Sequence, residues 1–101
     1  MKQEICRIDE IPEEGSLIVP FFEREVHVFR SDGHVRAIAN VCMHFGGPLE
    51  CANGKFTCPW HGASYDMNTL RRVDGPAPPN ARLMALSTVI EDGILNYVWG
   101  E

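Results

Sequence analysis

Apolar and polar residues alternate over short segments of this chain, and no long stretch repeats with the period of a helix. The clearest alternation covers residues 23–30, where Val26 and Val28 share one side of an extended chain and Glu25 and His27 share the other. Short runs rich in valine, isoleucine and phenylalanine are separated by glycine, proline and aspartate, which is typical of strands joined by turns. The pattern predicts strands at residues 3–8, 16–22, 23–30, 34–41, 82–91 and 94–99.

Two turn sequences predict hairpins between these strands. Ser31-Asp32-Gly33 precedes the strand at 34–41, and Asp92-Gly93 precedes the strand at 94–99. Pro20 cannot donate to a sheet ladder, so its strand is expected at an edge or a bulge. The chain is therefore expected to be all-β.

The middle of the chain has a different character. Residues 42–66 contain three of the four cysteines and two of the four histidines. We expect them to form an insertion between strands, within a single domain that covers residues 1–101. The basal β part is then about residues 1–41 and 67–101. After the insertion, the proline-rich residues 75–79 predict a stiff loop.

Composition and charge exclude several classes of function. The 14 acidic residues outnumber the 9 basic ones and give a net charge of −5, which argues against non-specific binding to nucleic acid or to anionic membranes. The longest early apolar run, Leu17–Phe22, is too short for a signal peptide or a membrane span. We therefore expect a cytoplasmic protein. In a reducing compartment, metal binding is a better first interpretation of the cysteines than disulfides.

Two sequence motifs pair a cysteine with a histidine: Cys42-Met43-His44 and Cys58-Pro59-Trp60-His61. Thiolates and imidazoles suit zinc, copper and iron–sulfur sites, and four ligands from two loops can enclose a metal centre. Gly46, Gly47 and Gly62 follow the motifs. They allow the backbone to bend close to the site and to direct N–H groups toward inorganic sulfur.

These motifs resemble the C-x-H and C-x-x-H motifs of Rieske [2Fe–2S] proteins. The flanking residues of 42–49 and 58–62 also look like the two cluster loops of that family, and Tyr65-Asp66, residues 75–78 and the hairpin at 92–93 match as well. The resemblance implies a small antiparallel β-sandwich or barrel-like fold, with a cluster-binding loop subdomain inserted between strands. It also implies one [2Fe–2S] cluster per chain.

The resemblance further implies a ligand set. Cys42 and Cys58 would bind the inner iron, and His44 and His61 the outer iron near the surface. Gly46, Gly47, Gly62 and Tyr65 would surround the cluster without binding iron, and Phe45, Trp60 and Pro78 would contact partner proteins. His44 and Cys58 are separated by thirteen residues, fewer than is usual in the family, and we place the deletion in the hairpin near residues 50–55.

The remaining cysteines and histidines have simpler interpretations. Cys6 and Cys51 are expected to be small buried residues or a free loop thiol. His27 and His34 are expected to be solvated surface histidines. A zinc site formed by the same four motif residues is the alternative to an iron–sulfur cluster, although zinc modules usually pair like ligands.

Several kinds of Rieske protein do not match this sequence. Respiratory and photosynthetic Rieske subunits have a membrane anchor and a disulfide between the loops, at positions that are here Gly47 and Trp60. Catalytic oxygenase subunits have a second, large domain. The chain therefore looks like a monomeric ferredoxin of a ring-hydroxylating dioxygenase system for aromatic hydrocarbon catabolism, not an enzyme itself. It would carry one electron from a flavoprotein reductase to a terminal oxygenase. The alternatives are a Rieske subunit of another redox complex, similar to the nitrite reductase small subunit, and a structural zinc module.

The reduction potential follows from the groups around the cluster. High-potential relatives have a serine hydroxyl where this chain has Ala63, and a net charge of −5 also disfavours an added electron. The hydroxyl of Tyr65, which the resemblance places near Cys42, would act in the opposite direction. We expect a midpoint on the order of −150 mV, raised by Ala63→Ser and slightly lowered by Tyr65→Phe. Voltammetry that finds a wild-type midpoint well above zero at neutral pH would contradict this argument and the assignment to an oxygenase system.

Overall fold

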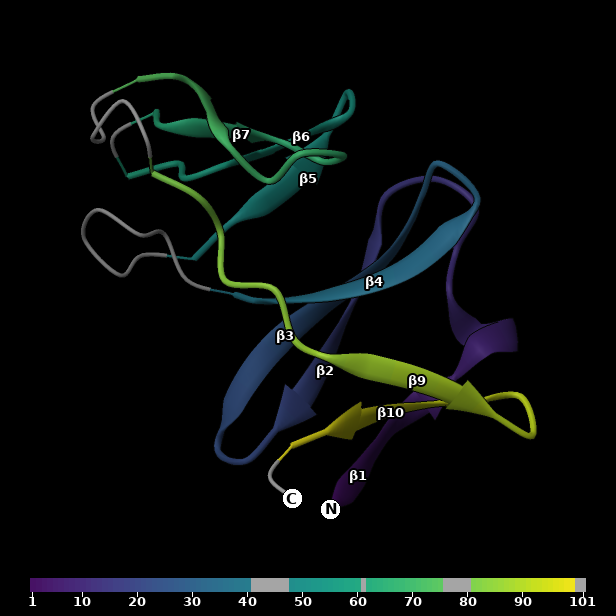
Figure 1. The fold of residues 1–101 in the computed structure, drawn as a ribbon. Helices are drawn as coiled ribbons and strands as arrows, with labels where there is room; N and C mark the ends of the chain where they lie inside the picture. The colour runs from purple at the N-terminus through teal and green to yellow at the C-terminus, as the bar shows by residue number, and fades with distance from the viewer. Residues whose placement is uncertain (41–47, 61, 76–80, 100–101) are drawn as a thin grey trace.

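A computed structural model describes residues 1–40, 48–60, 62–75 and 81–99. Within these residues, ten strands form three antiparallel sheets (Figure 1). Sheet A has the order β1 (Lys2–Arg7), β10 (Ile94–Val98) and β9 (Thr88–Glu91), and a short 3-10 turn, η1 (Ile8–Glu10), follows β1. Sheet B has the order β2 (Ser16–Phe21), β3 (Arg24–Ser31) and β4 (His34–Ala39). Sheet C has the order β5 (Glu50–Ala52), β6 (Lys55–Thr57), β7 (Ser64–Asp66) and β8 (Arg72–Asp74).

The six strands of sheets A and B lie within or close to the six predicted strands, and the all-β prediction is confirmed. The four short strands of sheet C were not predicted as strands. At the β3–β4 turn, Asp32 and Gly33 both have positive φ, as a two-residue type I′ turn requires. Asp92 and Gly93 have the same geometry between β9 and β10. Among the described strands, β2 pairs with β3 alone, so Pro20 lies on an edge strand as predicted.

The strand predicted at residues 82–91 is too long, because only Thr88–Glu91 forms a strand. The residues before Thr88 form hydrogen bonds first with the sheet C region and then with sheet B. The Leu83 N–H donates to the carbonyl of Leu70, and the Leu86 N–H donates to that of Ala37 in β4. A segment that moves from sheet C to sheet B over so few residues cannot keep the register of one ladder.

Sheet B lies between the other two sheets, and its central strand, β3, has buried residues on both faces. On one face, Val26 and Val28 of β3 pack in a cluster with Ile5 and Leu95 of sheet A. On the other face, the ring of Phe29 lies 5.0 Å from that of Phe56 in sheet C. Figure 1 shows sheets A and C at opposite ends of the molecule, with sheet B between them.

The burial of both faces corrects one prediction. His27 shares the face of Phe29 and is only 1% exposed, so it is not a solvated surface histidine. Its ring lies 5.0 Å from the ring of Phe56. The alternation in β3 was correct, but the face expected to meet solvent is covered by sheet C. His34 is exposed as predicted, because it lies at the turn that begins β4.

Sheet C begins inside the expected insertion and continues past residue 66 to Asp74. The β5–β6 hairpin closes through Asn53 and Gly54, both with positive φ, which makes it a minimal two-residue turn. In the turn between β7 and β8, a carboxylate oxygen of Asp66 accepts hydrogen bonds from the N–H groups of Asn68 and Thr69. These two bonds lower the pKa of Asp66. No helix long and apolar enough to cross a membrane occurs in the part of the chain that the structure describes.

Candidate metal centre

Cys58 begins the second predicted cluster loop, directly after β6, and its side chain is completely buried. It lies in the core cluster of sheet C with Leu49, Phe56, Ala63 and Tyr65. The Cys58 N–H donates to the carbonyl of Ala63 at 2.9 Å, and the Gly62 N–H donates to the carbonyl of Cys58 at 2.8 Å. The two bonds join the ends of the loop, and Gly62 permits the closure because its φ is +80°.

Gly75 lies directly against this loop. A β-carbon at Gly75 would lie 2.5 Å from the Cα of Ala63 and 2.6 Å from the carbonyl oxygen of Gly62. Its φ of +90° also favours glycine over any other residue. The Arg72 guanidinium donates to the Gly75 carbonyl at 3.0 Å, which fixes this approach from the side of β8. The second loop is therefore supported by backbone at a distance that excludes a side chain.

Tyr65 is completely buried in the same core cluster and lies across the β6–β7 pair from Phe56. Its predicted contact is with Cys42, which lies outside the described residues. Trp60 contrasts with its neighbours, because 68% of its surface is exposed although it follows Cys58 by two positions. The loop thus has one buried end and an exposed aromatic side chain.

The structure brings together the three predicted site residues Cys58, Gly62 and Tyr65. Trp60 is a fourth predicted residue within the described part of the chain, and the remaining predicted residues fall outside it. These are Cys42, His44, Phe45, Gly46, Gly47, His61 and Pro78.

Sequence reasoning missed a polar network at the ends of the first predicted loop. The His27 Nε2 lies 3.0 Å from the Asn40 Oδ1 and 3.0 Å from the Leu49 carbonyl oxygen. The Leu49 N–H also donates to the Asn40 Oδ1, at 2.9 Å. No local signal could have joined these residues, because they come from β3, the end of β4 and the start of sheet C.

The two cysteines outside the motifs are both partly or fully withdrawn from solvent. Cys6 is buried in the core cluster between sheets A and B. Cys51 is half-buried, and its Sγ lies 3.7 Å from the sulfur of Met67. Burial raises the pKa of both thiols, which favours their protonated form over the thiolate that binds metal.

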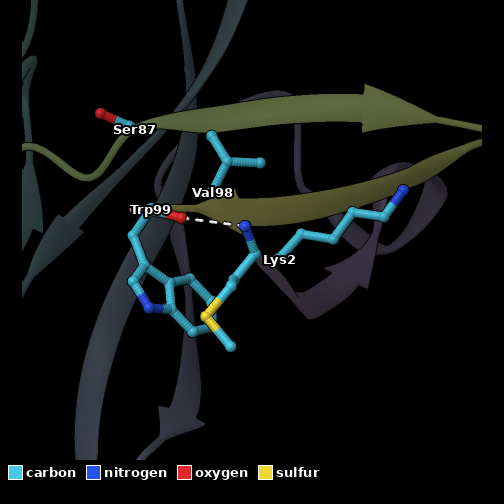
Figure 2. Close-up of a pocket in the computed structure, with 5 residues that line it drawn as sticks. Lys2, Ser87, Val98 and Trp99 are labelled. Atoms are coloured by element: carbon cyan, nitrogen blue, oxygen red, sulfur yellow. Dashed lines mark hydrogen bonds between the residues drawn. The ribbon is translucent and has the colours of Figure 1, made fainter. Parts of the chain in front are cut away.

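A pocket outside this region lies on sheet A. It is lined by Met1, Lys2, Ser87, Val98 and Trp99, and Figure 2 labels the last four of these residues. The N-terminal amine donates to the Trp99 carbonyl at 3.0 Å. The side chains of Lys2 and Ser87 point in opposite directions in this view, so they do not form a nucleophile–base pair. The Lys2 ammonium pairs with Glu91 instead.

Comparison with protein families identifies the chain. The family described as the Rieske [2Fe–2S] domain matches residues 1–90. The chain belongs to the Rieske [2Fe–2S] family. A domain of this family holds a [2Fe–2S] cluster, and the described residues fit that group. Cys58 supplies a sulfur donor in an apolar core, at the end of a loop that two backbone hydrogen bonds hold in place.

Individual relatives include several kinds of Rieske protein. The chain is 42% identical over 59 residues to the cytochrome b6-f complex iron–sulfur subunit 1 of the cyanelle of Cyanophora paradoxa, across 56% of this chain and 24% of that protein. The chain thus spans about a quarter of that relative.

Two solved structures show the same fold. The Sphingomonas yanoikuyae B1 ferredoxin has a TM-score of 0.79 and 21% identity, over 99% of this chain and 100% of that one. The terminal oxygenase of carbazole 1,9a-dioxygenase from Nocardioides aromaticivorans IC177 has a TM-score of 0.75 and 24% identity, over 99% of this chain and 30% of that one. The predicted antiparallel Rieske fold is thereby confirmed.

The contact of Gly75 with the second loop leads to a first prediction. We expect Gly75→Ala to lower the free energy of unfolding by about 1 kcal/mol for its positive φ and by about 1–3 kcal/mol more for the clash with Gly62 and Ala63. Gly93→Ala is the matched control, since Gly93 has a φ of +75° and nothing within 4 Å of a β-carbon. Denaturant titration measures both variants. Equal losses would show that Gly75 matters only for its backbone conformation.

The burial of His27 leads to a second prediction. Burial lowers the pKa of His27 from its ordinary value of 6.5, against smaller opposing effects from Leu49, Asn40 and Glu25. As pH falls below about 6.5, the unfolded chain takes up a proton at this residue that the folded chain does not. Stability that is fully present above that pH is therefore lost as pH decreases.

Thermal unfolding followed by circular dichroism measures this effect. The unfolding midpoint of the wild type should fall more steeply between pH 6.5 and 5 than that of His27→Gln. His34→Gln is the matched control, because His34 is exposed, and its curve should be parallel to that of the wild type. Parallel curves for the wild type and His27→Gln would contradict the prediction.

Proposed function

We propose that this chain transfers single electrons from a flavoprotein reductase to the terminal oxygenase of a ring-hydroxylating system, as a cytoplasmic monomer. The observation that best supports the proposal is the contrast within the second loop. Cys58 is completely buried, whereas Trp60, two residues later, is 68% exposed. A cluster bound at one end of this loop would lie close to a surface that a partner protein can reach. Since electron transfer slows steeply with distance, such a short path suits a carrier.

The proposed ligands are those of the motifs. Cys42 and Cys58 hold one iron, and His44 and His61 hold the other, with Gly46, Gly47 and Gly62 allowing close approach of the loop backbone. When bound, the cluster accepts and releases one electron. The residues of the chain keep it in an apolar environment and fix the loops, so that little rearrangement accompanies a change of redox state.

The proposed docking face consists of Phe45, Trp60 and Pro78. Of these residues, Trp60 lies in the described part of the chain, and it offers a large exposed aromatic surface of the kind that is enriched at protein interfaces. The net charge of −5 indicates that a basic partner surface would speed association at low ionic strength.

A second candidate function is that of a Rieske subunit in another redox complex. It is favoured by the identity of 42% with the cytochrome b6-f subunit of Cyanophora paradoxa. One observation opposes it: Gly47 and Trp60 occupy the two loop positions at which such subunits have their disulfide cysteines. The midpoint potential distinguishes the two functions, since quinol oxidation requires a high-potential cluster and transfer from a reductase requires a low one.

The ligand set leads to a third prediction. His44→Ala or His61→Ala should abolish the Rieske signal in the electron paramagnetic resonance (EPR) spectrum of the dithionite-reduced protein, because each removes one ligand of the outer iron. Cys51→Ser and Cys6→Ser are the matched controls and should leave the signal and the iron and sulfide content unchanged. The ligand set would be wrong if Cys51→Ser lost the cluster while Cys42→Ser retained it. A colourless protein that contains zinc would refute the iron–sulfur assignment.

The docking face leads to a fourth prediction. Trp60→Ala should slow electron transfer to a purified ring-hydroxylating oxygenase at least several-fold, without altering the EPR spectrum, because it removes a central aromatic contact. Phe22→Ala is the control, since Phe22 is 62% exposed but lies at the β2–β3 turn. Stopped-flow absorbance at two ionic strengths measures both effects, and the wild-type rate should fall as salt rises. Equal rates for the two variants would place the docking face elsewhere.

A further inference from the structure

The network of His27, Asn40 and Leu49 joins the two chain ends between which the first loop motif lies. Asn40 precedes Cys42 by two positions, and Leu49 follows His44 by five. The Asn40 Oδ1 accepts the Leu49 N–H at 2.9 Å, so one side chain ties the two ends together. The His27 Nε2 lies 3.0 Å from this oxygen and 3.0 Å from the Leu49 carbonyl oxygen.

The hydrogen bonds of the network fix the orientation of both side chains. Because the Asn40 Oδ1 accepts a backbone N–H, the amide nitrogen of Asn40 must point the other way, where it donates to a Glu25 carboxylate oxygen at 3.1 Å. The His27 Nε2 faces two oxygen acceptors and must therefore hold a proton. In the neutral ring, Nδ1 then accepts the hydroxyl of Ser16 at 2.7 Å.

The network is anchored to sheet B, with His27 and Leu49 buried and Asn40 half-buried. His27 is 1% exposed, and its ring packs on Phe56 of sheet C. The Asn40 N–H donates to the carbonyl of Glu25 at 3.0 Å, which continues the β3–β4 ladder to the start of the loop. At His27 and Leu49, which are buried, water cannot readily replace the lost bonds, so their loss leaves polar groups without partners.

We propose that His27 and Asn40 are positioning residues for the cluster, which fix the separation and direction of the chain ends on either side of Cys42 and His44. The inference rests on the proposed ligand set. One residue separates Asn40 from Cys42, and four residues separate His44 from Leu49. Because these segments are short, we expect a displacement of either end to displace the nearby ligand. A merely structural network would stabilise the fold without affecting how firmly the cluster is held.

The experiment measures the loss of iron from the holo protein to an excess of a ferrous chelator after reduction, at a temperature where every variant remains folded. Asn40→Ala and His27→Phe should release iron about tenfold faster than the wild type, which corresponds to about 1.4 kcal/mol. His27→Phe keeps an aromatic ring against Phe56 and removes only the hydrogen bonds. The double variant Asn40→Asp with Glu25→Gln keeps an oxygen that accepts both bonds and replaces the Glu25 carboxylate by an amide that can donate to the second oxygen of the new carboxylate, so it should release iron at close to the wild-type rate.

Asn96→Ala is the matched control, because Asn96 is a buried amide in β10 whose side chain donates to the nearby Ile94 carbonyl. It should lower stability but leave the rate of iron release unchanged. A second readout does not involve iron: hydrogen exchange at the Leu49 amide should be about tenfold faster in Asn40→Ala and unchanged in Asn96→Ala.

Two results would overturn the inference. One is iron release from Asn40→Ala and His27→Phe at the wild-type rate, and the other is an equal acceleration by Asn96→Ala. Either would leave the proposed function intact, because the wild type would still show a Rieske signal. A wild type without that signal would refute the ligand set itself, and with it the role of the network toward the cluster.

Discussion

The structure depends on one constraint, which is that sheet B is covered on both faces. Its central strand, β3, must therefore be buried on both sides, and it places Val26 and Val28 toward sheet A and His27 and Phe29 toward sheet C. Sheet C is too small to bury a core of its own, since each of its strands has three residues. Its contact with Phe29 through Phe56 supplies the missing apolar surface, so sheet C and the candidate metal centre are attached to the face of sheet B that carries His27 and Phe29.

Local patterns predicted most of the strands because hairpins depend on residues that are close in sequence. Asp32-Gly33 and Asp92-Gly93 define their turns, and the alternation in β3 correctly divides its residues between two faces. The same pattern could not show that both faces are covered, so His27 was wrongly placed in solvent. Alternation shows which residues share a face, and only the arrangement of the sheets shows what lies on it. The segment before Thr88 was misjudged for a related reason, because its hydrogen bonds go to two different sheets.

The same distinction applies to the candidate site, of which one part follows from the local sequence and another depends on contacts between distant segments. Cys58, Gly62 and Tyr65 could be singled out because the family motif is local, and the structure places all three together, while their roles toward the cluster stay predictions. The supports of the two loops could not be predicted. Gly75 was part of a recognisable turn, but the absence of room for a β-carbon arises from Gly62 and Ala63, which precede it in another strand connection. The pairing of His27 with Asn40 and Leu49 similarly joins residues from different sheets.

The second loop is supported by packing of backbone on backbone, and the ends of the first loop are joined by side-chain hydrogen bonds. At the second loop, backbone packs on backbone, and the space between Gly75 and Ala63 is too small for a side chain or a water molecule. At the first loop, a buried imidazole and an amide satisfy the polar groups of the chain ends. Both arrangements replace mobile solvent by fixed groups of the protein. In the low dielectric of the interior, such fixed hydrogen bonds are strong when complete and costly when incomplete. They therefore fix the chain on either side of the predicted ligands, as the proposed carrier requires if its ligands are to move little when an electron arrives or leaves.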